Sequence, residues 1–420
     1  MAVALRAGRL IDGSGREPVS DAVVLIENGR ISRVGPAHSV GVPAAAETLD
    51  FTSHTVLPGL IDCHVHLVFS AGTNPLADVL TGNDFAVLLR GAANARLALR
   101  AGVTTVRDLG GRANTTLALR DAINDGVLAG SRIMACGSPI TITGGHCHFL
   151  GLTADTEDEV RHAVRVQINQ GVDGIKIMST GGRMTPRTNS VWAQYSVAQL
   201  TAAVEETRRA GLTIAAHGHG AAGIRNAVQA GVDTIEHCTW VTERDGAEVA
   251  ALDEETALRM VRQGTYVVPT LLPASVAGRV EPSMLSEPSR RNVALRSAVA
   301  AIHRQLREMG VRFAAGTDSG VVLTPADGLP WELQLMMEDI GLSPLEAISA
   351  ATGDAARAIG LAADRGTLEL GRRADILVVD GDPATDITSL RRVRAVFKDG
   401  QAAVRDGVIL EPPRWQGWIT

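Results

Sequence analysis

Two histidines, His64 and His66, are separated by one residue inside the apolar run LPGLIDCHVHLVF. Residues two apart in a β-strand point to the same face, so the two imidazoles share a face of the predicted strand. Two neutral imidazoles on one face can bind a divalent metal ion through nitrogen. The alternative is a pair of buried histidines whose ring nitrogens are satisfied by backbone groups. A His-x-His pair alone does not decide between them.

Lys176 stands between two isoleucines in GIKIMS. If the isoleucines face covering helices, alternation along a strand turns Lys176 toward the interior. Burial of an unpaired ammonium is unfavourable and lowers the lysine pKa, which makes the neutral, nucleophilic amine accessible. That amine could form a Schiff base, or take up carbon dioxide as a carbamate that bridges two metal ions. The alternative is a salt bridge to an interior carboxylate.

Three further polar residues come at the ends of apolar segments: His217 ends TIAAHG, His237 ends TIEHC, and Asp318 ends RFAAGTD. With His64, His66 and Lys176 they make six potential ligands from five predicted strands. In a (β/α)8 barrel, functional residues lie at the C-terminal ends of the strands. The shared position of these residues therefore predicts a common site.

Eight apolar strand candidates alternate with longer helical patterns through the middle of the chain. The strands are predicted at 60–66, 104–110, 132–137, 174–179, 213–218, 234–238, 266–271 and 312–318. Helical segments such as EDEVRHAVRVQINQG and SVAQLTAAVEETRRAG end in glycine, which is typical of the position after a helix. Eight β/α units in series favour an α/β fold of the (β/α)8 TIM-barrel type. An open sheet is the alternative, because strand order cannot be read from the pattern.

The two ends of the chain carry short alternating strands separated by turn signals. We expect them to form one small β-sandwich domain, built from residues 1–57 and 366–420. The intervening residues 58–365 then form the catalytic barrel.

Composition restricts the classes of function. The chain has 420 residues, 45% of them apolar and 3% aromatic, with a net charge of −6. The charge and the lack of a basic block argue against nucleic-acid or anionic-membrane partners, and no apolar run is long enough for a membrane span. The four cysteines have no Cys-x-x-Cys spacing and are expected to be reduced and buried. Without a signal-peptide pattern at the start, a cytoplasmic enzyme is expected.

The motifs PGLIDCHVH, GIKIMSTGG, AAHGHG, TIEHCTW and AAGTDSG resemble the metal-ligand motifs of the amidohydrolase superfamily. The similarity covers nearly the whole chain and is greatest to the prolidase-like and imidazolonepropionase-like hydrolases. KIMSTGGRMTP also resembles relatives that act on amide, carbamate or urea bonds of xenobiotics. Barrel enzymes of this kind are often homo-oligomers, so a homo-oligomer is expected.

The resemblance implies two divalent metal ions, of which zinc is the expected one. By this resemblance His64, His66 and Asp318 bind one ion, His217 and His237 bind the other, and N6-carboxylated Lys176 bridges both. A hydroxide shared by the metals would be the nucleophile, and Asp318 would carry its proton to the leaving nitrogen.

Other histidines are candidate catalytic or substrate-binding residues. His219 stands where several relatives have a tyrosine and could donate a hydrogen bond to the oxyanion; the strand period equally allows His219 to be the ligand in place of His217. His146 lies in a GGH segment that the resemblance places at the scissile carbonyl, and His148 could share its role. Loop histidines in solvent are the alternative.

Arg183 and Arg187 follow the fourth predicted strand and could hold a substrate carboxylate, or be solvated loop charges. Tyr195 and Trp192 are expected to line the pocket. The segment PTLLPASVAGRVEPSMLSEPSR is either a lid or a surface connection.

The function predicted from these residues is hydrolysis of an amide bond in a small-molecule substrate, either a Xaa-Pro-like dipeptide or an N-acyl amino acid. A carbamate, urea or cyclic-amide hydrolase is the alternative with the same chemistry. A non-catalytic scaffold is a third possibility, but none of the six ligands is missing.

Overall fold

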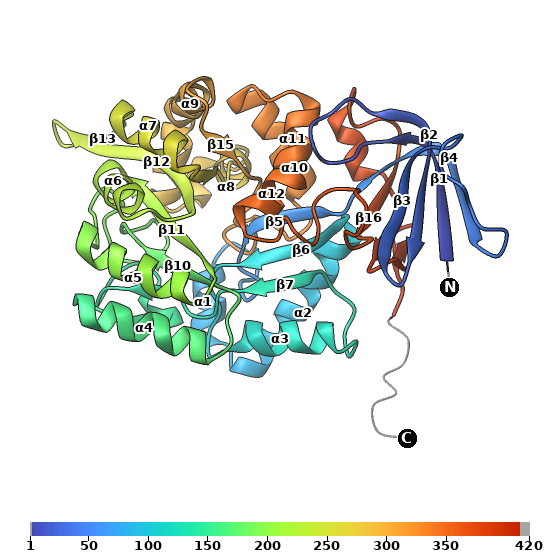
Figure 1. Ribbon diagram of the computed structural model, residues 1–420. Coiled ribbons are helices and arrows are strands. Elements are labelled where there is room, and N and C mark those ends of the chain that lie inside the picture. Colours follow the sequence, from blue (N-terminus) through green and yellow to red (C-terminus); the bar gives the residue numbers. More distant parts are fainter. Residues whose placement is uncertain (1, 412–420) are drawn as a thin grey trace, which may run out of the picture.

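The computed structural model describes residues 2–411, and its central part is an α/β fold with parallel strands (Figure 1). All eight predicted strands form in the predicted order. Three make one parallel sheet, β5 (Leu60–Val65), β6 (Val103–Asp108) and β7 (Arg132–Ala135). The other five lie in a second sheet, β10 (Gly174–Met178), β11 (Thr213–Gly220), β12 (Thr234–Arg244), β14 (Tyr266–Val268) and β15 (Arg312–Phe313). Short strands β8 (Ile140–Thr141) and β9 (Leu152–Thr153) extend this sheet, and β13 (Ala247–Ala250) forms a hairpin with β12.

The two parallel sheets do not join into one continuous ladder, which differs from the closed barrel expected from the pattern. They nevertheless meet along one seam. Cys63 N donates to Ala315 O at 2.9 Å, and Asp318 N donates to His64 O at 2.8 Å. β15 is only two residues long because the chain beyond it contains Gly316 and a left-handed Asp318, which interrupt regular pairing.

Helices cover the strands and follow the expected β/α alternation (Figure 1). The longer ones are α2 (Asp84–Arg100), α3 (Thr115–Asn124), α4 (Glu157–Asn169), α5 (Val197–Arg209), α6 (Ala221–Ala230), α7 (Glu254–Gln263) and α9 (Glu287–Glu308). The shorter ones are α1 (Pro75–Thr81), α8 (Leu272–Ala277), α10 (Leu329–Leu335), α11 (Pro344–Ala350) and α12 (Gly353–Ala358). One turn of π-helix, η3 (Met336–Ile340), and three 3-10 turns complete the set: η1 (His148–Leu150), η2 (Pro282–Met284) and η4 (Ile387–Arg391).

Local sequence explains where the central helices begin and end. Thr156 and Ser196 each open a helix with a reciprocal capping box, in which the side chain accepts a backbone N–H three residues on. The predicted glycine stops after these helices, Gly171 and Gly211, have φ of 82° and 70°, a left-handed conformation that glycine adopts without strain. Within residues 2–411, no helix combines the length and apolar character that crossing a bilayer would require.

Strands from the two ends of the chain pair with each other in one hydrogen-bonded path, and residues of the first two strands share a core with residues of the C-terminal strands. The β-sandwich arrangement of these strands stays a prediction. The additional strands are β1 (Ala2–Leu10), β2 (Val19–Glu27), β3 (Arg30–Pro36), β4 (Glu47–Pro58), β16 (Ile376–Asp380), β17 (Val393–Lys398), β18 (Gln401–Arg405) and β19 (Val408–Ile409). Their order is β19-β18-β17-β16-β4-β1-β2-β3. The twelve-residue β4 pairs with β1 on one side and β16 on the other, so the hydrogen-bonded path has no break.

Ion pairs fasten this terminal sheet to the central fold. Arg132, at the start of β7, donates to Asp375 at 2.8 Å and also contacts Asp399. Asp375 is buried, with 5% of its surface exposed, so its carboxylate depends on these donors. The junction lies at the N-terminal ends of the strands, away from the predicted ligands.

We expect Arg132→Met to lower the free energy of unfolding by about 2 kcal/mol, because it leaves a buried carboxylate without its cation. Arg394→Met is the matched control, since its pair with Asp406 is largely exposed and should contribute about 0–1 kcal/mol. Urea unfolding of both variants measures the difference. Equal free energies of unfolding for the two variants would contradict a stabilising role of the buried Arg132–Asp375 ion pair.

Candidate active site

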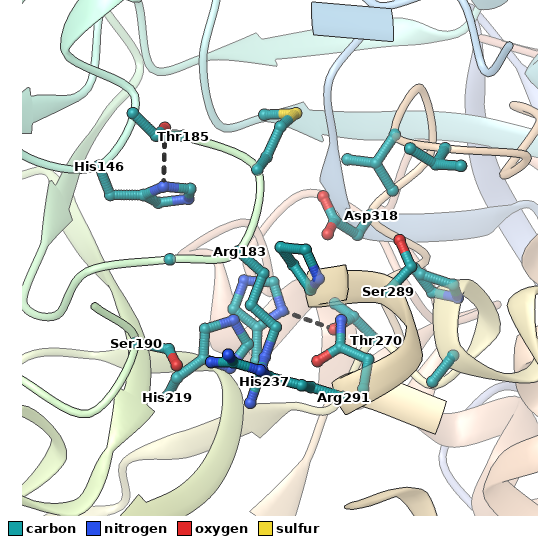
Figure 2. Close-up of a pocket in the computed structure, with 18 of the residues that line it drawn as sticks. His146, Arg183, Thr185, Ser190, His219, His237, Thr270, Ser289, Arg291 and Asp318 are labelled. Atoms are coloured by element: carbon teal, nitrogen blue, oxygen red, sulfur yellow. Dashed lines mark hydrogen bonds between the residues drawn. The ribbon is translucent and has the colours of Figure 1, made fainter. Parts of the chain in front are cut away.

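A cavity of about 830 Å³ opens at the C-terminal ends of the central strands. Its floor collects all six predicted ligands and two further histidines: His64, His66, Lys176, His217, His237, Asp318, His146 and His219. Figure 2 shows several of them directed toward the same space, with Asp318 opposite the loop that carries His146. Residues distant in sequence therefore converge as the sequence predicted.

The imidazoles form a close cluster. The ring centroid of His217 lies 4.7 Å from the ring centroids of His219 and of His237. The ring centroids of His64 and His237 are 5.1 Å apart. Two sets of three residues present ligand atoms within 4.8 Å of one another: His217, His219 and His237, and then His64, His237 and Asp318. This spacing suits the donor groups of a metal site.

Asp318 faces the paired histidines of β5. Its Oδ1 lies 3.4 Å from Nε2 of His64 and 3.5 Å from Nε2 of His66. The other nitrogens of these rings are held from behind, since His66 Nδ1 donates to Gly110 O at 3.3 Å and His64 Nδ1 donates to Glu236. Both rings therefore turn an unprotonated Nε2 toward Asp318 and the cavity.

Left-handed backbone at the strand ends directs several of these residues inward. His237, Cys238, Thr270 and Asp318 have φ of 64°, 52°, 50° and 55°. Strict alternation would put Glu236 and His237 on opposite faces, yet both side chains reach the interior because the chain turns at His237. Such conformations are unfavourable for residues other than glycine and persist only where surrounding contacts hold them.

A buried carboxylate supports His64. Glu236 Oε2 accepts from His64 Nδ1 at 2.8 Å, and its Oε1 accepts from Arg107 at 2.8 Å and from Thr234 at 2.5 Å. Arg107 Nε also donates to Cys63 O at 2.7 Å, so the network joins β5, β6 and β12 across the interior. Glu236 and Arg107 were not singled out from the sequence, although charged residues inside apolar strands are the signal that identifies them.

Two outer helices support His237. Its Nδ1 is hydrogen-bonded to Thr270 Oγ1 at 2.7 Å (Figure 2), and Glu332 of α10 accepts the backbone N–H groups of the two residues after Thr270 at 2.8 and 2.7 Å. His303 of α9 lies with its Nε2 at 3.2 Å from His237 O and 3.1 Å from Cys238 O. Because carbonyl oxygens only accept, Nε2 of His303 carries its proton. These contacts hold the turned end of β12.

Lys176 is fully buried, and its Nζ has no hydrogen-bond partner among the described residues. Burial lowers its pKa, an effect that the carboxylates of Glu236 and Asp318 oppose. An unpartnered buried amine is unfavourable unless a further group satisfies it. The salt bridge to an interior carboxylate, which was the alternative for Lys176, does not form within ion-pair distance in the described part of the chain.

Burial also keeps the clustered imidazoles neutral. It lowers the pKa of His66 to about 4 and that of His146 to about 3, with the Lys176 charge adding to the effect. The pKa values of His64, His217, His219 and His237 are lowered well below 6.5, again chiefly by burial. Neutral imidazole is the form that binds metal ions.

His217 and His219 differ in which nitrogen is free. His217 Nε2 donates to Gly181 O at 3.2 Å, which leaves Nδ1 with a lone pair. Thr239 donates to His219 O at 3.2 Å, so its Oγ1 accepts from His219 Nδ1 at 3.0 Å and leaves Nε2 of His219 unprotonated. In this arrangement His219 offers the cavity a lone pair, which suits a ligand better than the predicted oxyanion donor.

His146 lines the cavity, with its ring centroid 4.5 Å from that of His217. Its Nδ1 lies 3.0 Å from Thr185 Oγ1, and that oxygen also accepts the Cys147 N–H at 2.9 Å (Figure 2). A hydroxyl that already accepts can donate to Nδ1, which leaves Nε2–H free as a donor. Gly182 makes room for the ring, because a Cβ there would lie 2.2 Å from His146 Cε1.

The predicted carboxylate anchors lie on the cavity wall. Arg187 is exposed at the rim, whereas Arg183 is largely covered and donates to Glu248 Oε2 at 2.8 Å. Glu248 comes from β13, and its Oε1 also lies 3.4 Å from Arg291 of α9. The ion pair of Arg183 with Glu248 was not expected from sequence.

Three residues predicted at the pocket lie elsewhere. Tyr195 is buried in the apolar core, where its hydroxyl donates to Ala154 O at 3.0 Å. His148 is exposed, with Nδ1 donating to Gly145 O, and Trp192 is 68% exposed. By contrast the segment after β14 does cover the cavity: α8, η2 and the start of α9 contribute Pro273, Met284 and Ser289 to its lining.

The comparisons agree with this geometry. The model of the amidohydrolase family matches residues 55–403. The chain belongs to the amidohydrolase family. It is 32% identical to ochratoxinase of Aspergillus niger, over 93% of this chain and 83% of that protein. It is 25% identical to imidazolonepropionase of Rhizobium rhizogenes, over 87% and 88% of the two chains.

Among solved structures, a Xaa-Pro dipeptidase with methionine bound in its active site superposes with a TM-score of 0.86. It is 30% identical and covers 96% of this chain and 99% of its own. The expectation of an amidohydrolase is confirmed, and this amidohydrolase is an enzyme that hydrolyses carbon–nitrogen bonds.

We expect Glu236→Gln to lower the free energy of unfolding by about 3 kcal/mol, because Arg107 then stays buried without a counterion. We also expect less bound metal, since the single oxygen of glutamine cannot accept from both His64 and Arg107, which weakens the contact that fixes the His64 ring. Urea unfolding and elemental analysis measure the two effects.

The double variant Arg107→Met/Glu236→Leu separates them. Apolar replacement of both charges should recover stability but not metal content, because His64 Nδ1 then lacks an acceptor. Recovery of both would mean that Glu236 has no role in orienting His64.

Proposed function

We propose that this amidohydrolase is a binuclear metal enzyme that cleaves an amide bond next to a carboxylate, in a Xaa-Pro-like dipeptide or an N-acyl amino acid. The observation that carries the proposal is the convergence of neutral imidazoles, Asp318 and an unpartnered buried Lys176 on one cavity. We also propose that the two parallel sheets act as one (β/α)8 barrel around this site.

The residues present fit a pair of divalent cations. The cluster supplies nitrogen and carboxylate donors, and the rings of His64 and His66 are held so that a lone pair faces the cavity. The amine of Lys176 is buried without a partner, as expected for a side chain that functions as a carbamate. Imidazole and carboxylate ligands suit zinc, and also manganese, iron or cobalt.

We assign His64, His66 and Asp318 to one ion, His217 and His237 to the second, and carboxylated Lys176 to both. We propose that His219 is either a further ligand of the second ion or a residue that orients His217 and His237. Its Nε2 is unprotonated and carries a lone pair. When bound, such ions lower the pKa of a water molecule and polarise the substrate carbonyl.

The protein's own groups then handle protons and orientation. Asp318 has one oxygen toward His64 and His66, and we assign its other oxygen, Oδ2, to carry a proton from the attacking water to the leaving nitrogen. His146 directs an Nε2–H into the cavity and is positioned to donate to the carbonyl oxygen as negative charge develops.

Arginines at the rim support an anionic substrate. Arg183, Arg187 and Arg291 line the outer cavity, where Glu248 is the single carboxylate among the described lining residues. Their excess positive charge attracts a carboxylate, and a guanidinium can bind one through two hydrogen bonds. The similarity to a Xaa-Pro dipeptidase supports an amide-cleaving site.

One observation favours the alternative of a carbamate, urea or cyclic-amide substrate. Arg183 is already paired with Glu248, so part of its charge is neutralised without any ligand. A panel of N-acyl amino acids, Xaa-Pro dipeptides, carbamates and phenylureas, assayed with zinc, manganese or cobalt, tests the proposal. Turnover confined to substrates without a carboxylate would overturn it. Light scattering of the purified protein tests the expected homo-oligomer.

We expect Lys176→Ala to lose most activity and at least one bound metal ion per chain, because the bridging anion is absent. Elemental analysis and mass spectrometry for an added carboxyl group on the wild-type lysine measure this. Lys398→Ala is the control, since Lys398 is partly buried but donates to Gly130 O far from the cavity. Full metal content in Lys176→Ala would contradict the bridging role.

We expect Arg183→Gln to raise KM for carboxylate substrates about tenfold or more, through loss of a charge-assisted bond. The corresponding amide-capped substrates should change little. Glu205→Gln, on the outer face of α5, controls for the effect of a remote charge change.

A further inference from the structure

We propose that the cavity selects substrates whose acyl side carries no ammonium group, and therefore prefers N-acyl amino acids to dipeptides with a free amino terminus. This inference rests on the proposed function, because it concerns the part of the substrate on the carbonyl side of the cleaved amide. It narrows that function to one of the two substrate types considered.

The outer cavity has no carboxylate left for an ammonium group. Both oxygens of Glu248 are engaged: Oε2 accepts from Arg183 at 2.8 Å, and Oε1 lies 3.3 Å from Ser190 Oγ and 3.4 Å from Arg291. Glu287, one turn before Arg291 on α9, is paired with that arginine. Arg187 adds a further positive charge at the rim, and no described carboxylate lies within ion-pair distance of it. Figure 2 shows Arg183, Arg291 and Ser190 around the same opening.

The inner cavity also has no carboxylate available to bind an ammonium group. Asp318 faces His64 and His66 and belongs to the reactive centre. Glu236 is fully buried behind His64, with both oxygens accepting hydrogen bonds. Arg296, which also lines the cavity, is paired with Asp339 outside it. Among residues 2–411, each carboxylate near the cavity is therefore either paired or, as with Asp318, part of the reactive centre.

An ammonium group bound here would lose hydration and lie near several cations. Removing a charged group from water is unfavourable unless an opposite charge or several good acceptors replace the water. Hydroxyl and carbonyl oxygens of the lining accept hydrogen bonds but provide no net negative charge. The metal ions of the proposed function would add to the repulsion.

A neutral acyl group meets no such obstacle. Much of the remaining lining is aliphatic or thioether, including Leu76, Met184, Met284 and Val322. Such surfaces gain free energy by covering an apolar acyl chain, and methionine adapts to groups of different shape. The cavity of about 830 Å³ has room for an acyl group larger than a single amino acid.

The test uses matched substrates that differ only in the amino group. Alanyl-phenylalanine and propionyl-phenylalanine have the same carbon skeleton, and both release phenylalanine. Equivalent pairs ending in proline and methionine allow for an unknown preference at the leaving residue. With the zinc-loaded wild-type enzyme, we expect kcat/KM to be at least about tenfold higher for the propionyl substrate of each pair that reacts.

Arg291 provides the matched variants. Both variants remove the positive charge of Arg291 and release Glu287, which is paired with it. Arg291→Glu adds a further carboxylate near the rim, whereas Arg291→Gln does not, so the difference between the two variants isolates the added negative charge. Arg291 is exposed, so both substitutions should leave the fold intact, which thermal unfolding checks. We expect the preference for the propionyl substrate to fall about fivefold or more in Arg291→Glu, and by less in Arg291→Gln.

The outcomes separate this inference from the function on which it rests. If both members of a pair react and the alanyl substrate is equal or better, the inference is wrong while the proposed function stands. An unchanged preference in Arg291→Glu also overturns it, because the charge at the rim then has no influence. If no substrate with a carboxylate reacts while a carbamate or urea does, the proposed function fails and this inference fails with it.

Discussion

The fully buried carboxylate of Glu236 lies between a guanidinium and an imidazole, and the arrangement of the site depends on it. Arg107 on one side and His64 on the other come from the small parallel sheet, whereas Glu236 comes from the larger one. The network therefore joins the two sheets across the interior and also determines which nitrogen of His64 reaches the cavity. A buried charge pair contributes little net stability, but loss of one partner is strongly unfavourable, so the interaction restricts the fold to one arrangement.

Strained backbone at the strand ends is the second constraint. His237 adopts a left-handed conformation within β12, where its register with β11 shifts, and Thr270 and Asp318 do so just beyond β14 and β15. The contacts of Glu332 and His303 show what holds two of these turns in place: side chains from the outer helices take up backbone groups that the strands no longer pair. The helices thus maintain the inward direction of His237 as well as covering the apolar core.

Charge is distributed differently at the two depths of the cavity. At the floor, burial keeps the imidazoles neutral, which prepares them to bind cations. At the rim, Arg183 and Arg291 are paired with Glu248 and Glu287, and Arg187 lies without a carboxylate partner among the described residues. The residues proposed to carry out the reaction therefore lie at the strand ends. The residues proposed to select the substrate lie in the loops and in helix α9.

The sequence determined the order of the strands along the chain, the ends of helices at Gly171 and Gly211, and the candidate ligands. These features follow from local rules: alternation within a strand, capping, and the rarity of polar residues in apolar runs. His64, His66 and Lys176 were identifiable because each interrupts such a run.

Only the tertiary structure decided the pairing of distant groups. The contact of Glu236 with His64 joins residues 172 positions apart, and that of Arg183 with Glu248 joins residues 65 positions apart. Tyr195 was misplaced because its burial depends on neighbouring helices, not on its distance from Arg183 in the chain. Strands from the two chain ends became neighbours because the long β4 pairs with β1 on one side and with β16 on the other. Local periodicity predicts which face a side chain occupies, but not which group lies across from it.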